Sequence, residues 1–239
     1  MNIQSQQFLE AFIAIEQHLA NLSGLPRGTP FTQQVDTLRQ RNQAVRAYAE
    51  DLKAFARLRN VIVHERGGGQ ILAEPNAWAV NRITVLRDLL LTPPTVRQFI
   101  RTKVVSIDSK QSLTTAIRLM SNQHFSQLPV YHKMQYHGIL SVRNVTYFLG
   151  AQPQHVIDLD TYTVADVLTH AAQRDTAVFV AQKTPLIDVL AHFATHNRRG
   201  TYLDAVLVTQ DGDTQQPLLG LIAAADIPAM NERLQLYSN

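Results

Sequence analysis

An internal repeat after about residue 94 constrains the fold of this chain more than any other feature of its sequence. A Thr-Val pair at Val96 returns at Val164, and an apolar run that starts at Gly138 returns at Gly220. The spacing between the two copies grows from 68 residues at the first pair to 82 at the second, as small loop insertions would produce. Because chance similarity would not keep several elements in one order, the sequence predicts two copies of one structural unit.

Each copy alternates short β-branched runs with amphipathic stretches. In the first copy Leu113, Ile117 and Met120 recur at helical spacing between two strand-like runs. This alternation is typical of a βαβ organisation. We expect strands at 104–107, 127–131 and 139–142 and helices at 112–122 and 143–149, with matching elements in the second copy.

The run from Phe125 to Tyr131, with Leu-Pro-Val at its centre, and the Gly-Ile-Leu that starts at Gly138 resemble the CBS motif. Two such copies resemble a CBS pair. The resemblance implies a tandem pair of βαββα motifs related by pseudo-two-fold symmetry. Because the residues before this pair show helical periodicity, we expect an α+β chain in which an all-helical N-terminal domain precedes the pair. It places the first motif at 94–155 and the second at 156–239.

The same resemblance implies two clefts in which adenosine derivatives often bind. The family often holds the ribose with a Ser/Thr-x-x-Asp pattern, and a carboxylate is well suited to accept hydrogen bonds from the ribose diol. The first copy has Ser141 and Asn144 at these positions, and the second has Ala223 and Asp226. We therefore expect an adenine nucleotide such as AMP, ADP or ATP as regulatory ligand, with Asp226 on the ribose and Arg143 as a candidate phosphate contact.

Each of these residues has an alternative interpretation. Asp226 stands where it could simply cap a helix, since Asp is a favoured N-cap and Pro228 follows. Arg143 could be an ordinary solvated arginine. The whole pair could be a dimerisation scaffold that has lost its ligand.

The first 92 residues form the third expected domain and show helical periodicity throughout. We expect helices over about 8–22, 31–65 and 76–91, the second with Leu52, Phe55, Leu58 and Ile62 in the core. Trp78 is predicted to be buried. Thr92-Pro93-Pro94 is a stiff break, because proline cannot continue a helix.

Near the end of the second expected helix, Arg59-Asn60-x-x-x-His64 resembles the signature of the HEPN superfamily. The resemblance implies a dimeric, metal-independent ribonuclease. In such an enzyme His64 would act as general acid and base and Arg59 would stabilise the phosphorane. Asn60 lies four residues before His64 and shares its helix face. The alternative is that these side chains only hydrogen-bond across a dimer interface.

Composition excludes several other classes of protein. The chain has no cysteine, so disulfides and thiol catalysis are excluded, and its nine histidines show no metal-ligand spacing. A formal net charge of +3 permits RNA contact without requiring it. No apolar run is long enough to span a membrane and no secretory leader precedes the first helix, so we expect a cytoplasmic protein.

Two functions follow from these patterns. The first is a ligand-sensing regulator whose CBS pair controls a helical output domain, with RNA as a candidate target. The second is a non-enzymatic adaptor in which the CBS pair is a scaffold and the helical domain binds a protein or a nucleotide. Both imply a homodimer or a higher even-numbered oligomer.

Overall fold

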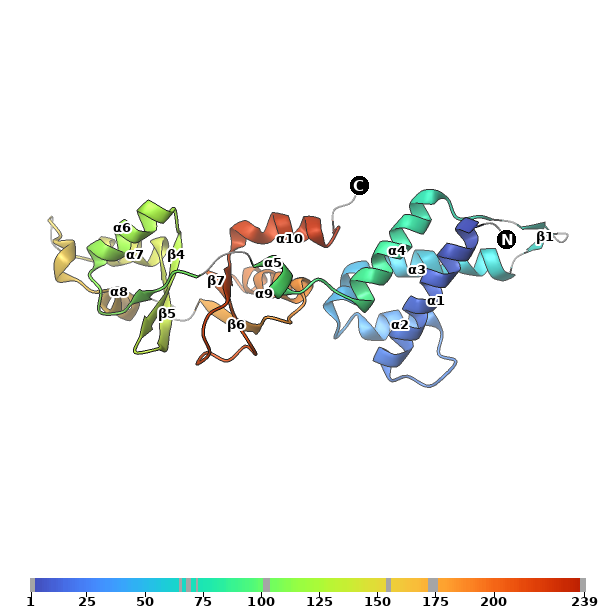
Figure 1. Cartoon of the computed structure of the whole chain (residues 1–239), viewed down its shortest axis with the longest axis horizontal. Coiled ribbons are helices and arrows are strands. Elements are labelled where there is room, and N and C mark those ends of the chain that lie inside the picture. The colour runs from blue at the N-terminus through green and yellow to red at the C-terminus, as the bar shows by residue number, and fades with distance from the viewer. Residues whose placement is uncertain are drawn as a thin grey trace. The chain divides into compact units, whose positions relative to one another are not determined.

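The computed structural model describes residues 3–64, 66–67, 70–71, 73–100, 104–153, 156–171 and 176–236, without the side chains of residues 64, 66–67 and 70–71. The chain divides into two compact units (Figure 1). The helical unit comprises residues 1–94 and 232–239, and the repeat unit comprises residues 95–231.

In the described part of the helical unit there are four helices and a short hairpin. They are α1 (Ile3–Ser23), α2 (Phe31–Leu38), α3 (Gln43–His64), β1 (Arg66–Gly67), β2 (Gln70–Ile71) and α4 (Ala77–Leu91). Helices α1 and α4 lie side by side (Figure 1). Their apolar faces share one core with α2 and α3, in which Phe8 packs edge-on against Phe55 with ring centroids 5.7 Å apart.

The expectation of one long helix over 31–65 was wrong, because the chain breaks between α2 and α3. The Oδ1 atom of Asn42 accepts a hydrogen bond from the Val45 amide at 2.9 Å and so starts α3. The guanidinium of Arg41 donates to the carbonyls of Leu22 and Ser23 at 2.9 and 2.7 Å. The break is therefore stabilised by the Asn42 cap and by Arg41, which provides hydrogen-bond donors for the free carbonyl groups at the end of α1.

The prediction of a buried Trp78 was also wrong, since this side chain is 63% exposed. Asn76 caps α4 by accepting from the Ala79 amide at 2.9 Å. From that start the buried face of α4 runs through Ala79 and Ile83. Trp78 precedes this face and contacts the core only at its margin, with its ring centroid 6.4 Å from that of Phe55.

The repeat unit contains the same series of elements twice. The first series is α5 (Val96–Phe99), β3 (Ile107–Asp108), α6 (Leu113–Gln123), β4 (Gln127–His132), β5 (Gln135–Ser141) and α7 (Val142–Gly150). After a 3-10 turn at Leu159–Thr161, the second series is α8 (Val164–His170), β6 (Ala177–Ala181), α9 (Leu186–Arg198), β7 (Ala205–Thr209), β8 (Gly220–Ile222), a 3-10 turn at Ala224–Asp226, and α10 (Ile227–Arg233). The first strand was expected at 104–107, but only Ile107 of that range pairs in the sheet.

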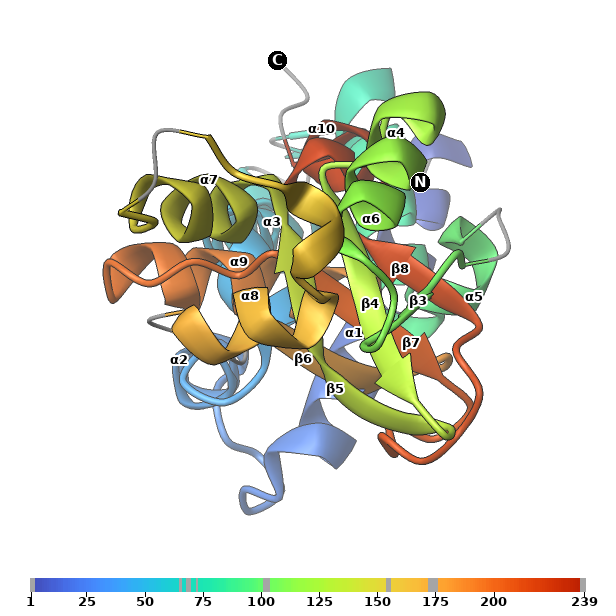
Figure 2. The ribbon, with the colours of Figure 1, turned by 90° about the vertical axis from the view of Figure 1, so that its left-hand side faces the viewer.

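Each series forms one three-stranded mixed sheet, in the orders β3-β4-β5 and β6-β7-β8. In both sheets the first two strands are parallel and the last two form an antiparallel hairpin. In the first sheet, Leu140 is buried against helices. The preceding residue, Ile139, is buried against Ala205 and Leu207 of the second sheet. Because successive strand residues point to opposite faces, each of these neighbours serves a different layer. Figure 2 looks onto the helices of the first repeat.

The two repeats exchange their leading helices. The Val96 amide at the start of α5 donates to the Thr184 carbonyl of the second repeat at 2.9 Å. The equivalent Val164 amide of α8 donates to the Gln111 carbonyl of the first repeat at 3.0 Å. This reciprocal bonding confirms the predicted α+β fold with two symmetry-related repeats.

Candidate functional site

The positions predicted to contact a ligand lie at two equivalent strand-to-helix junctions. Strand pairing fixes the equivalence, because Val130 pairs with Gly138 in the first hairpin and Val208 pairs with Gly220 in the second. Asn144 and Asp226 each lie six residues after these two glycines, so they occupy equivalent positions. We call residues 141–144 the first junction and residues 223–226 the second junction.

The first junction is closed by its own hydrogen bonds. Ser141 and Asn144 are only 4% and 7% exposed. The Ser141 hydroxyl accepts from the Asn144 amide at 3.2 Å and so caps α7. The side-chain Nδ2 of Asn144 donates to the Ile139 carbonyl at 3.2 Å. Asn144 is thus held inside the protein rather than presented to a ligand.

Arg143 at the same junction is also engaged. Its guanidinium lies 2.9 and 3.1 Å from the two carboxylate oxygens of Asp204, and it stacks 3.9 Å over the Tyr202 ring. Asp204 accepts a further hydrogen bond from the Thr176 hydroxyl at 2.6 Å. Arg143 therefore joins the two repeats, and its charge is already compensated.

Three residues of this cluster were not predicted from the sequence, namely Thr176, Tyr202 and Asp204. One signal was available for Asp204. It occupies the place that Ser126 holds in the first repeat, and a charged residue directly before a buried strand requires a partner. Only the packing of the two repeats shows that the partner is Arg143.

The second junction differs in charge and in openness. Asp226 is partly exposed, and its Oδ2 atom accepts from the Ala223 amide at 2.8 Å. Among the described residues, no donor reaches its other carboxylate oxygen. The residue equivalent to Arg143 is the exposed Ala225, and Ser126 replaces the acid of the first junction. Asp226 therefore bonds back to the start of the 3-10 turn at Ala224–Asp226, as the third residue of that turn and not as the predicted N-cap, and its other carboxylate oxygen remains open to a ligand.

The Arg-Asn-x-x-x-His motif lies at the end of α3. The Arg59 guanidinium donates to the Oδ1 atom of Asn60 at 3.3 Å. On the same helix, the Lys53 ammonium forms a 2.6 Å ion pair with Asp36, so the charge of Lys53 is compensated. The side chain of His64 lies outside the described residues. The catalytic hypothesis for Arg59, Asn60 and His64 stays a prediction.

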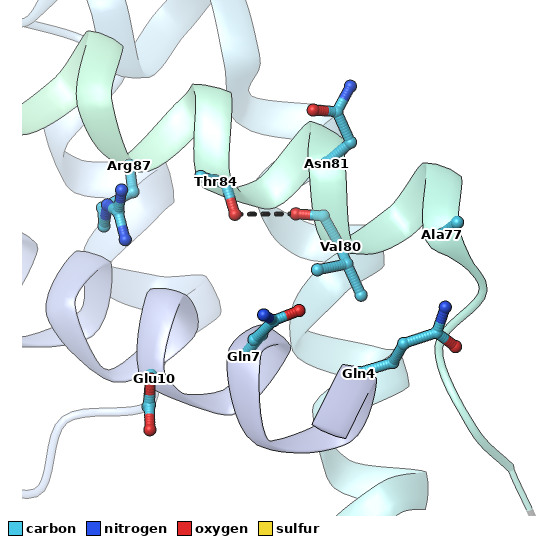
Figure 3. A pocket seen from close by; sticks show the side chains of 8 residues that line it. All are labelled: Gln4, Gln7, Glu10, Ala77, Val80, Asn81, Thr84 and Arg87. Atoms are coloured by element: carbon cyan, nitrogen blue, oxygen red, sulfur yellow. Dashed lines mark hydrogen bonds between the residues drawn. The ribbon is translucent and has the colours of Figure 1, made fainter. Parts of the chain in front are cut away.

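A groove of about 470 Å³ runs between α1 and α4 (Figure 3). Gln4 and Gln7 line it from α1, and Asn81 and Thr84 from α4. The Gln7 side chain extends into the space between the helices, while the Thr84 hydroxyl donates to the Val80 carbonyl at 2.8 Å. Its charged residues Glu10 and Arg87 are each bonded to a neighbour on their own helix, at Gln6 and Asp88. The groove therefore offers the neutral amides of Gln4, Gln7 and Asn81 beside apolar and charge-compensated side chains.

The described part of the chain contains no cluster of three or more His, Cys, Asp or Glu side chains that could hold a metal ion. None of its helices combines the length and the apolar character that a membrane span needs.

Residues 96–151 match the CBS domain family, which covers the first repeat from α5 to the end of α7. No curated protein matches the chain.

Solved structures with CBS domains resemble the repeat unit. The CBS domain pair of protein MJ0100, in complex with 5-methylthioadenosine and S-adenosyl-L-methionine, is 14% identical and covers 59% of this chain and 98% of its own, with a TM-score of 0.45. CBSX2 in complex with AMP is 18% identical over 59% of this chain and 98% of its own, with a TM-score of 0.44. A hexameric CBS-CP12 protein from bloom-forming cyanobacteria is 21% identical over 57% of this chain and 67% of its own, with a TM-score of 0.43.

Proposed function

We propose that the repeat unit is a CBS pair that binds an adenine nucleotide at the second junction, and that this binding regulates the helical unit. One observation carries the proposal. Asp226 keeps a carboxylate oxygen open at one of two equivalent helix starts, whereas the other start is filled by Asn144 and by the Arg143–Asp204 pair. A single junction per chain is therefore suited to a ligand.

The chemistry of the second junction fits a ribose better than a phosphate. Two adjacent ribose hydroxyls can donate to one carboxylate, and hydrogen bonds to a charged acceptor are the stronger kind. No arginine stands at position 225, where the first junction has Arg143. AMP and adenosine compounds are the ligands named for two of the similar CBS structures, which agrees with this class.

Thermal unfolding with AMP, ADP and ATP tests the proposal. A ligand that binds only the native state stabilises it by about 2.7 kcal/mol at 100 times its dissociation constant. Asp226→Asn is the sharpest variant, because the Asn carbonyl oxygen can still accept from the Ala223 amide while the charge that would hold the diol is lost. Asp166→Asn is its matched control. The Asp166 carboxylate likewise accepts a hydrogen bond from the backbone amide three residues earlier, at Thr163, and Asp166 lies outside both junctions.

We expect at least one nucleotide to raise the midpoint for the wild type and for Asp166→Asn, and much less for Asp226→Asn. If no nucleotide raises the midpoint at millimolar concentration, the sensor proposal fails. The repeat unit is then better described as a scaffold.

A second candidate function for the helical unit is protein binding rather than RNA cleavage. The α1–α4 groove favours it, because its side-chain amides both donate and accept and so match the backbone of an extended, uncharged peptide. An assay with single-stranded RNA, using His64→Ala as control, separates the two. Cleavage that His64→Ala abolishes would establish the ribonuclease and displace the adaptor.

The oligomeric state belongs to the same proposal. We propose a homodimer or a higher even-numbered assembly, in which the output of the helical unit depends on two chains. Sedimentation velocity with and without AMP measures it. A monomer under both conditions would remove this part of the proposal.

A further inference from the structure

A second cavity lies in the repeat unit, away from both junctions. Its volume is about 530 Å³, within the range of small-molecule sites. One wall is the turn between β4 and β5, at the opposite end of β5 from Ser141. The other wall is the loop before β8, residues 215–218. Both repeats thus contribute to the cavity.

The first wall is a strained turn. Lys133 and Met134 are its two central residues, and both have positive φ angles, 48° and 67°. Two-residue hairpin turns of this kind favour Asn-Gly, because positive φ angles are energetically unfavourable for most residues with larger side chains. Both residues nevertheless line the cavity. Strain that is retained beside a cavity is typical of a site whose side chains have a function.

The second wall comes from an insertion. Seven residues separate Val130 from Gly138 in the first hairpin, and eleven separate Val208 from Gly220 in the second. The longer loop is fixed internally, because Gln216 donates to the Asp211 carboxylate at 2.9 Å and accepts from the Asp211 amide at 2.8 Å. The insertion is therefore an ordered wall.

Tyr131 lines the cavity, and its hydroxyl is buried and has no hydrogen-bond partner among the described residues. The pairing of β4 with β5 shifts register between Val130 and Tyr131, and such bulges often re-aim a side chain next to a functional site. A buried hydroxyl without a partner is unfavourable. A ligand that reaches the hydroxyl from the cavity that Tyr131 lines would supply one.

The charges of the cavity indicate the ligand. The Lys133 ammonium forms no ion pair with a described residue, so it is available to an anion. The Asp108 carboxylate on the same wall is already bonded by His132 at 3.2 Å and by the Lys110 amide at 2.8 Å, and it would repel a group with several negative charges. Apolar contacts are offered by Val104, Met134, Pro217 and Leu218.

We propose that this cavity binds a small aliphatic monocarboxylate, whose carboxylate is held by Lys133 and the Tyr131 hydroxyl and whose apolar body lies against Met134 and Leu218. Because the ligand bridges the two repeats, it stabilises their packing. The site is separate from the adenine-nucleotide site and does not depend on it.

Isothermal titration calorimetry of the full chain with 4-methyl-2-oxopentanoate and with L-leucine tests the proposal. The two probes share an aliphatic body and a carboxylate, and only leucine adds an ammonium that Asp108 could accept. We expect saturable binding of at least one probe and none of the neutral 4-methylpentanamide. Tyr131→Phe should weaken binding about tenfold, and Lys133→Ala by at least as much.

The variants also carry a stability signature. Tyr131→Phe and the double change Lys133→Asn with Met134→Gly should raise the melting temperature of the unliganded protein, because they remove the unpaired hydroxyl and the strain. Tyr162→Phe and Lys183→Ala are matched controls outside the cavity and should leave the affinity unchanged. Absence of binding by either probe, or binding that Tyr131→Phe and Lys133→Ala leave intact, overturns the proposal.

Discussion

The guanidinium of Arg143 in the first repeat lies 2.9 Å from the nearer carboxylate oxygen of Asp204 in the second repeat. Both side chains are largely shielded from solvent, at 24% and 15% exposure, and Tyr202 covers the guanidinium. The pair therefore links the two repeats at the place where an equivalent ligand position would otherwise open.

Replacing Arg143 by Ala should lower the free energy of unfolding by about 2–3 kcal/mol, because it leaves Asp204 partly buried without its cation. Urea denaturation measures the change. Arg118→Ala, at an exposed position of α6, is the control and should cost less than about 0.5 kcal/mol. In a double-mutant cycle, Arg143→Ala combined with Asp204→Ala should cost less than the sum of the two single changes. Additive costs would mean that the pair does not couple the repeats.

Asp166 should make the stability of the repeat unit depend on pH in the acidic range. Hydrogen bonds from the Thr163 backbone amide and then from its hydroxyl hold the pKa of the Asp166 carboxyl below its usual value. A carboxyl whose pKa is lower in the folded state stabilises the fold above its unfolded pKa of about 3.9, and that contribution disappears as the pH falls through the folded pKa.

Asp166→Ala should therefore cost about 1 kcal/mol at pH 7, and the difference from wild type should shrink below about pH 4. Unfolding of both proteins at several pH values measures it. A difference that stays constant down to pH 2 would contradict the electrostatic part of this explanation.

Tyr48 should make the helical unit sensitive to alkali. Its hydroxyl donates to the Leu234 carbonyl at 2.7 Å, and burial raises the pKa of Tyr48 to about 12. The unfolded chain releases this proton near pH 10, so the stabilisation is complete below pH 10 and is lost as the pH rises toward 12.

Tyr48→Phe should cost about 1 kcal/mol at pH 7, and its stability should fall less steeply than that of the wild type between pH 10 and 12. Circular dichroism during denaturation follows both proteins. Parallel pH profiles for the two would show that Tyr48 does not carry the effect.

The exposure of Trp78 can be tested against a buried neighbour on the same helix. Trp78→Ala should change the free energy of unfolding by less than about 1 kcal/mol, because its ring is mostly in solvent. Ile83→Ala should cost about 3 kcal/mol, since Ile83 is fully buried and its removal leaves a cavity. Chemical denaturation of the two variants compares them. Similar losses would mean that Trp78 is part of the core.

The sequence by itself determined the order and type of the elements in the repeat unit. The repeat was readable because each copy must bury the same alternating strand residues and the same helix face, and this demand leaves a periodic pattern. The long helix over 31–65 was predicted wrongly because Asn42 acts as a cap, which depends on a local choice between helix and turn that periodicity does not record. The prediction of a buried Trp78 was wrong for a related reason. Helix α4 can bury only one of its faces, and its first turn decides which face that is.

Only the tertiary structure decided the chemistry of the two junctions. The sequence showed Asn144 and Asp226 at matching places, but it could not show that Asn144 donates to Ile139 or that Arg143 is paired with a residue 61 positions away. The cavity lined by Tyr131 and Lys133 was likewise invisible, because its two walls come from different repeats. Helix and strand patterns depend on residues that are neighbours in the sequence, so they can be predicted from it. Burial and charge compensation depend on which distant segments come into contact, and only folding brings those segments together.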